Sequence, residues 1–168
     1  ARFQREHPDI LLELTATDQR ASLRRYEADV ALRLSNDPPQ GVTKDKLGNV
    51  LFRLYRCASA PLDLTCYVAP PAVQEISPKI RRVLPDAKIV LSVDGFIQIR
   101  EYITQGVGIG MLPRALGDKD PRLQPVSPEL FEDSLLLWSA CLPEQKRLLR
   151  VQKLMQFLRR ELKELPIV

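Results

Sequence analysis

The sequence is poor in the residues that build metal centres. Its 168 residues include one histidine, His7, and three widely spaced cysteines, Cys57, Cys66 and Cys141. A structural zinc site needs four ligands at characteristic short spacings, and these cysteines form no C-x-x-C pair. We therefore expect no metal site, and free thiols in a reducing compartment.

Groupings typical of catalytic sites are also missing from the sequence. A Ser–His–Asp triad would have to use His7, which precedes Pro8 and is typical of a residue that ends a helix. The glycines at 106, 108 and 110 do not form a phosphate-binding G-x-G-x-x-G loop, because Met111 stands where the third glycine belongs. They predict the end of a helix, followed by a strand packed closely below it. We expect a protein that is not an enzyme and that needs no cofactor.

Long apolar runs are absent too. No stretch approaches the roughly 18 apolar residues that span a bilayer, so we expect no membrane segment. The start, Ala1–Glu6, is amphipathic and lacks the pattern of a signal peptide. It reads as the middle of a helix, from which we expect a fragment of a cytoplasmic protein. Hydrophobic content of 45% and charged content of 27% are typical of a globular domain.

Positive charge is concentrated near the end of the chain. Residues 144–165 hold seven basic and three acidic residues, which equals the whole net charge of +4. The same segment has apolar residues at helical spacing and predicts the longest helix. Its basic stripe is interpreted as a solvated face, with a phosphate-binding surface as the alternative.

Two segments follow a strand–helix–strand pattern. The first has strands at 10–15 and 29–34 around a helix at 19–27; the second has strands at 88–93 and 107–112 around a helix at 96–105. Each unit should cross over right-handed and contribute parallel strands. Because each is small for a domain, we expect two α/β lobes with a cleft between them.

Several segments, in order along the chain, resemble motifs of the LysR-type transcriptional regulators. The most specific is Gly106–Pro113, which reads GVGIGMLP and is similar to the family pattern G-x-G-I-A/G-x-L-P. Asp29–Leu34 resembles its D-V-A-L-R strand. The others are Phe3–Ile10, Lys46–Gly48, Leu135–Trp138 and the basic helix with Phe157 and Leu158. The resemblance covers essentially all 168 residues.

This resemblance implies a type 2 periplasmic-binding-protein-like fold, with two α/β lobes joined by two crossover strands. Residues 1–57 would form the first part of lobe I, 58–122 lobe II, and 123–168 the return to lobe I with the closing helix. The sequence lacks the family's N-terminal winged helix-turn-helix, the first strand of lobe I and most of its first helix. DNA would therefore be bound only through a segment outside these residues.

Candidate ligand-binding residues follow from the ends of the predicted strands, where ligands bind in parallel α/β sheets. In lobe II they lie at one strand-to-helix turn, where family members hold the effector and where Gly95 permits a close approach to the backbone. Asp94 could equally cap the helix, and Arg56 could pair with an effector carboxylate or lie on the surface. The full set is Thr15, Thr17, Ser35, Arg56, Val93, Asp94, Gly95, Phe96 and Met111.

The implied function is effector sensing. A small-molecule effector would bind in the cleft between the lobes and change the arrangement of a homodimer or homotetramer, and so control transcription. The alternative is a free periplasmic solute-binding protein for a small polar ligand.

Overall fold

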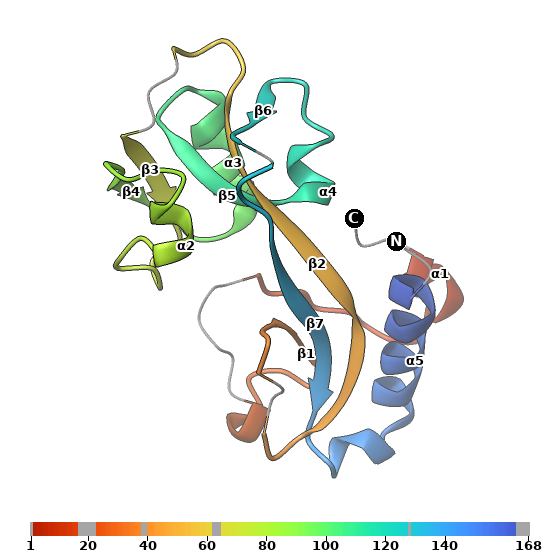
Figure 1. Ribbon diagram of the computed structural model, residues 1–168. Helices are drawn as coiled ribbons and strands as arrows, with labels where there is room; N and C mark the ends of the chain where they lie inside the picture. The colour runs from red at the N-terminus through yellow and green to blue at the C-terminus, as the bar shows by residue number, and fades with distance from the viewer. Residues whose placement is uncertain (1, 17–22, 38–39, 62–64, 128, 164–168) are drawn as a thin grey trace. The chain divides into compact units, whose positions relative to one another are not determined.

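The computed structural model describes residues 2–16, 23–37, 40–61, 65–127 and 129–163 (Figure 1). Contacts divide the chain into two units. Unit 1 is built chiefly from residues 1–50 and 135–167, and unit 2 chiefly from Leu51–Ser134. Two strands, β2 (Thr43–Cys57) and β7 (Asp133–Cys141), pass from one unit to the other. The lobe boundaries expected from the sequence, after residues 57 and 122, lie at the end of β2 and just before β6.

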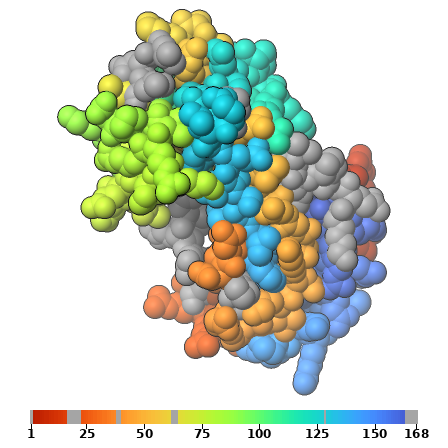
Figure 2. Space-filling view, viewed as in Figure 1, coloured from red at the N-terminus to blue at the C-terminus, as the bar shows by residue number. Residues whose placement is uncertain are grey.

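The hydrogen-bonded order of the strands is β1-β7-β2-β5-β3-β4, and β6 also pairs with β2. Figure 2 shows β7, in blue, beside β2, in orange, in agreement with their neighbouring places in this order. No helix of the described residues has the length and apolar character needed to cross a bilayer.

Unit 2 contains a three-stranded parallel arrangement. β3 lies between β4 and β5 and is parallel to both, while β2 is antiparallel to β5 and β6. The second predicted strand–helix–strand unit is therefore confirmed, with β3 inserted between its two strands. The elements are β3 (Cys66–Ala69), α2 (Pro78–Arg81), β4 (Lys88–Ser92), α3 (Phe96–Thr104), β5 (Ile109–Pro113), α4 (Arg114–Gly117) and β6 (Leu123–Pro125).

Alternation along these strands gives unit 2 a core on each side of the sheet. Val68 and Leu112 pack with Ile99 and Ile103 of α3. The residues on either side of Val68 along β3 point to the other face of the sheet and belong to a second cluster. Its members are Leu54, Tyr67, Ala69, Ile76, Ile80, Leu84, Ala87, Ile109, Val126 and Phe131.

The glycines between α3 and β5 act as the sequence predicts. Gly106 has a φ of 80° and follows the end of α3. A Cβ on Gly110 would stand 2.7 Å from Cδ1 of Ile103, and one on Gly108 would stand 2.6 Å from the carbonyl oxygen of Cys66. Only the missing side chains allow β5 to lie this close to α3 and β3.

Unit 1 packs its helices against β7 and the first half of β2. Cys141 of β7 is buried with Val151 and Met155 of α5, and the Phe3 ring lies 5.2 Å from the Phe157 ring. β1 pairs with β7 in antiparallel register. The elements are α1 (Arg2–Glu6), a 3-10 turn (Leu23–Arg25), β1 (Ala31–Leu34), a second 3-10 turn, η2 (Gln145–Arg147), and α5 (Leu149–Lys163).

The first predicted strand–helix–strand unit is wrong. Residues 11–16 form neither helix nor strand, and Leu11 and Leu14 are 91% and 83% exposed. Of the predicted helix, residues 19–22 lie outside the described residues and Leu23–Arg25 form only a 3-10 turn. β1 pairs with β7 in antiparallel register, so the described residues of this segment show no parallel crossover. An apolar pattern becomes a strand only where a neighbour supplies hydrogen bonds, and residues 11–16 have no paired strand in the described structure.

A tight contact fixes α4 on β2. The Tyr55 side chain is fully buried, and its hydroxyl donates a hydrogen bond to Oδ1 of Asp118 at 2.5 Å. Burial and this bond raise the pKa of Tyr55 far above its usual value. A Cβ on Gly117 would lie 2.3 Å from Cζ of Tyr55.

We expect Gly117→Ala to lower the free energy of unfolding by about 1–3 kcal/mol, because the buried ring has no room to retreat. Urea unfolding measures this cost. In the double variant with Tyr55→Leu, the clash is relieved, so the two costs should sum to more than the measured total. Simple additivity of the two substitutions would contradict the packing argument.

An ionic cluster ties α3 to the segment before β6. The carboxylate of Asp120 accepts hydrogen bonds from the Arg122 guanidinium at 2.7 and 3.0 Å, and Arg100 of α3 lies 3.8 Å away. The Arg122 hydrogen bonds lower the pKa of Asp120 to about 2.

Because the folded-state pKa of Asp120 lies below its unfolded value, the carboxylate stabilises the fold above about pH 4 and loses this effect as the pH falls towards 2. We expect the melting temperature of Asp120→Asn to fall less over this range than that of the parent protein. Asp86→Asn, at an exposed carboxyl, is the matched control and should follow the parent. An unchanged acid profile in Asp120→Asn would contradict the assignment.

Candidate functional site

The carboxyl ends of the parallel strands meet at one edge of unit 2. Ala69 of β3 pairs with Ser92 of β4, and Val68 pairs with Gly110 of β5. This register places Met111 beside Ala69, in the same row as Ser92. The Val93–Phe96 turn, which follows Ser92, therefore emerges at the same edge as Met111. Ligands of parallel α/β sheets bind at such an edge.

The turn from β4 to α3 brings four predicted residues together. The backbone N–H of Val93 donates to the Ala69 carbonyl at 3.0 Å, while Asp94 is exposed. The N-cap of α3 is Gly95, one residue after Asp94, and it offers no side-chain hydrogen bond. The first hydrogen bond of the helix runs from Ile99 to Gly95, so the amides of 96–98 have no acceptor within α3.

Gly95 has backbone angles of φ 79° and ψ 148°. This region of backbone conformation is essentially restricted to glycine. A Cβ there would also lie 2.9 Å from Oε1 of Gln98. Both the backbone conformation and the nearby Gln98 side chain therefore favour glycine at this position.

Apolar side chains surround this edge. The Phe96 ring packs on the core beneath α3 and lies 5.6 Å from the ring of Phe52. Met111 is half-buried and packs against the cluster on the other side of the sheet, which includes Tyr67. Burial raises the pKa of Tyr67 to about 12, opposed by a backbone hydrogen bond from Met111. The Tyr67 hydroxyl therefore stays uncharged at neutral pH.

Phe52 was not predicted as a site residue. The sequence marks it as a strand residue next to the expected crossover, but pairing of Phe52 with Pro113 at the end of β5 is what brings its ring to this edge. Alternation along β2 carries no information about that register.

Arg56 lies elsewhere. β2 runs antiparallel to β5, so Arg56 lies level with the start of β5, while Pro113 at its end faces Phe52. The Arg56 guanidinium donates to the carbonyls of Cys57 and Ala60 at 3.0 Å each and to Oε1 of Gln124 at 2.9 Å. These bonds hold the chain after β2 against β6.

The remaining predicted residues belong to unit 1 or are not described. Thr15 is exposed in the irregular segment. The Ser35 hydroxyl accepts a hydrogen bond from the Asp37 amide at 3.1 Å, and its carbonyl accepts one from the Trp138 indole at 3.0 Å. Thr17 lies outside the described residues.

The basic residues of α5 are paired with acids of unit 1. Arg159 contacts Asp45 at 2.6 Å and Arg160 contacts Glu6 at 2.7 Å. Longer contacts of 3.7 and 3.8 Å join Arg150 to Asp29 and Lys153 to Asp9. This pairing supports the interpretation of the basic stripe as a solvated face, because paired cations have less charge to offer a phosphate.

Within the described ranges, no group of three or more His, Cys, Asp or Glu side chains is arranged to hold a metal ion. The three cysteines are free thiols. Hydrogen bonds from Ser59 lower the pKa of Cys57, whereas burial raises that of Cys141.

The chain has the same fold as solved structures of LysR-type transcriptional regulators. The regulatory domain of CrgA, a LysR-type transcriptional regulator from Neisseria meningitidis, matches with a TM-score of 0.77 and 19% identity, over 96% of this chain and 88% of that one. A second structure of CrgA matches with a TM-score of 0.80 and 20% identity, over 96% of this chain and 61% of that one. The full-length structure of AphB, a virulence activator of Vibrio cholerae, matches with a TM-score of 0.71 and 17% identity over the same shares. The chain thus spans about 61% of the length of these two structures.

No curated protein sequence matches the chain. The structural matches confirm the expected fold class, a type 2 periplasmic-binding-protein-like α/β fold. Residues 1–163 match the model of the LysR substrate binding domain, and the chain therefore belongs to this family.

Proposed function

We propose that this domain senses a small-molecule effector at the edge of unit 2 formed by Val93–Phe96 and Met111. The observation that carries the proposal is the convergence of three features on that edge. They are the carboxyl ends of three parallel strands, a glycine turn followed by helix amides that have no acceptor within α3, and half-buried Phe96 and Met111. The resemblance to the family adds Thr15, Thr17 and Ser35 as the lobe I contribution to a cleft between the lobes.

The chemistry of the edge restricts the ligand. Phe96 and Met111 suit an apolar body, and the amides that start α3 suit a hydrogen-bond acceptor. Asp94 is an exposed carboxylate beside them. A ligand with a hydroxyl or amine near Asp94 fits this arrangement better than one that presents only negative charge.

Signalling requires that the effector bind two arrangements of the protein with different affinity, since a ligand shifts an equilibrium only by that difference. We propose that these are two arrangements of a homodimer or homotetramer. DNA would be reached through a winged helix-turn-helix outside this sequence, and the regulator would act in the cytoplasm. The match to the LysR family favours this role over a free periplasmic solute-binding protein, and the regulatory relatives support a role without catalysis.

A thermal-shift screen of small acids, amino acids and aromatic metabolites against the full-length regulator tests effector binding. An effector at 100 times its Kd should stabilise the protein by about 2.7 kcal/mol, which corresponds to roughly 5–10 °C.

For the effector found, we expect Phe96→Ala and Met111→Ala to weaken binding at least about tenfold, because each removes apolar contact from the ligand. Tyr102→Ala, at a partly exposed aromatic on α3 away from the turn, is the control and should bind normally. Isothermal titration calorimetry measures the three affinities. Normal affinity in both Phe96→Ala and Met111→Ala would remove this edge from the site.

Self-association is a separate expectation. Sedimentation velocity of the full-length regulator should show a dimer or tetramer, and the effector should change its sedimentation coefficient or its association constant, because the proposed signal is a change of arrangement. A monomer at every concentration, with and without effector, would contradict this mechanism while leaving effector binding intact.

A further inference from the structure

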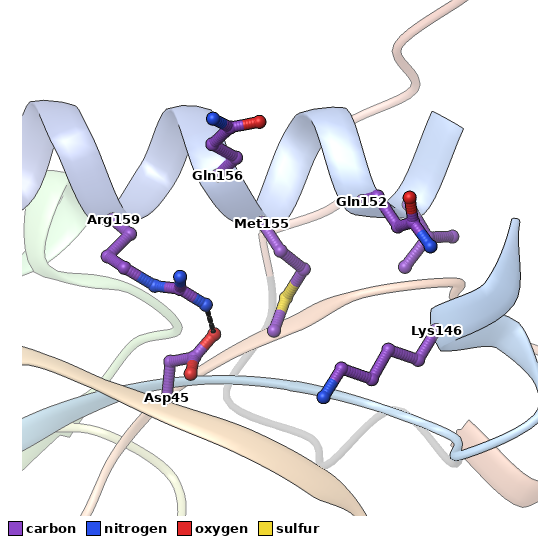
Figure 3. A pocket seen from close by; sticks show the side chains of 7 residues that line it. Asp45, Lys146, Gln152, Met155, Gln156 and Arg159 are labelled. Atoms are coloured by element: carbon purple, nitrogen blue, oxygen red, sulfur yellow. Dashed lines mark hydrogen bonds and ion pairs between the residues drawn. The ribbon is translucent and has the colours of Figure 1, made fainter. Parts of the chain in front are cut away.

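Unit 1 contains a hollow of its own between α5, η2 and β2. Its volume is about 230 Å³, and Figure 3 shows the side chains that line it. The lining residues are Asp45, Lys146, Val151, Gln152, Met155, Gln156 and Arg159. All of them belong to unit 1, whereas the candidate effector edge belongs to unit 2.

The charges around this hollow are unequal. At one end the Arg159 guanidinium and the Asp45 carboxylate form an ion pair of 2.6 Å, so their charges neutralise each other. At the other end stands Lys146, whose ammonium has no hydrogen-bond or ion-pair partner among the residues that the structure describes. The first turn of α5, which contributes Val151 and Gln152 to the lining, carries no acidic side chain. The hollow therefore presents one unneutralised positive charge.

The base of the hollow is apolar. Val151 and Met155 are 2% and 6% exposed and pack on the buried thiol of Cys141. Figure 3 shows the Met155 thioether pointing from α5 into the hollow, with Lys146 extending towards it from η2. Methionine adapts its shape to whatever apolar group lies against it.

We propose that this hollow binds a small organic carboxylate, separately from the effector edge. The carboxylate pairs with Lys146, and the apolar part of the molecule lies against the Met155 thioether, beside Gln152. The volume is below the usual 300–1,000 Å³ of pockets for drug-sized ligands, which restricts the occupant to a short chain or a single ring.

The two methionines of the sequence allow ligand binding to be measured separately at the two sites, because Met111 lies at the effector edge and Met155 in the hollow. Their methyl NMR signals can be followed in the full-length regulator after [methyl-13C]methionine labelling. Met111→Leu and Met155→Leu assign the signals, which keeps the method valid when other methionines are present.

Benzoate is the probe, with butyrate, acetate and neutral benzamide for comparison. We expect benzoate to shift the Met155 signal saturably, butyrate to bind more tightly than acetate, and benzamide to have little effect. Lys146→Gln should weaken benzoate binding at least about tenfold. The matched control Arg147→Gln removes the same charge from the next, exposed residue, which does not line the hollow, and should leave binding unchanged.

Three results would overturn the proposal. They are a Met155 signal that none of the carboxylates moves, equal affinities for acetate and butyrate, or equal effects of Lys146→Gln and Arg147→Gln. A shift of Met111 alone would assign benzoate to the effector edge, and so would reject the second site while supporting the first.

Discussion

The close approach of α3 to β5 is the constraint on which the candidate site depends. Gly110 lies directly beneath Ile99 and Ile103, and any larger residue would push the helix away from the sheet. That contact fixes where α3 begins, and with it the positions of Gly95, Phe96 and the first amides of the helix. Gly108 fixes the distance between β5 and β3 in the same way, because a side chain there would collide with the backbone of Cys66. The edge at which the parallel strands end is therefore set by two glycines that are not themselves among the candidate ligand-binding residues.

Much of unit 2 could be predicted from sequence. The strand at 88–93, the helix at 96–105 and the glycine-rich strand after it all correspond to elements of the structure. Their signals are local: apolar alternation, a helix stop at Gly106 and a turn at Gly95. The order of the strands is not local. Nothing in the spacing of β4 and β5 indicates that β3 lies between them, so Phe52 and Tyr67 could not be placed near the site.

Unit 1 shows where local patterns mislead. The apolar run at 10–15 is typical of a strand, but Leu11 and Leu14 are exposed, because burial of an apolar side chain depends on what packs against it rather than on the pattern itself. The closing helix was easier to predict, because its apolar stripe meets Cys141 of β7 within the same unit. Its basic stripe was ambiguous in the sequence, since the acids that pair with it, such as Asp45 and Glu6, are more than one hundred residues away.

Gly95 carries a consequence for how this domain is studied by mutagenesis. Its torsion angles exclude residues with a side chain whether or not a ligand is ever bound. A library selected only for retained folding would therefore mark this position as intolerant, and the intolerance would say nothing about recognition. Sensitivity at Phe96 and Met111, where ordinary backbone conformations accept other side chains, is the informative measure of what the domain detects.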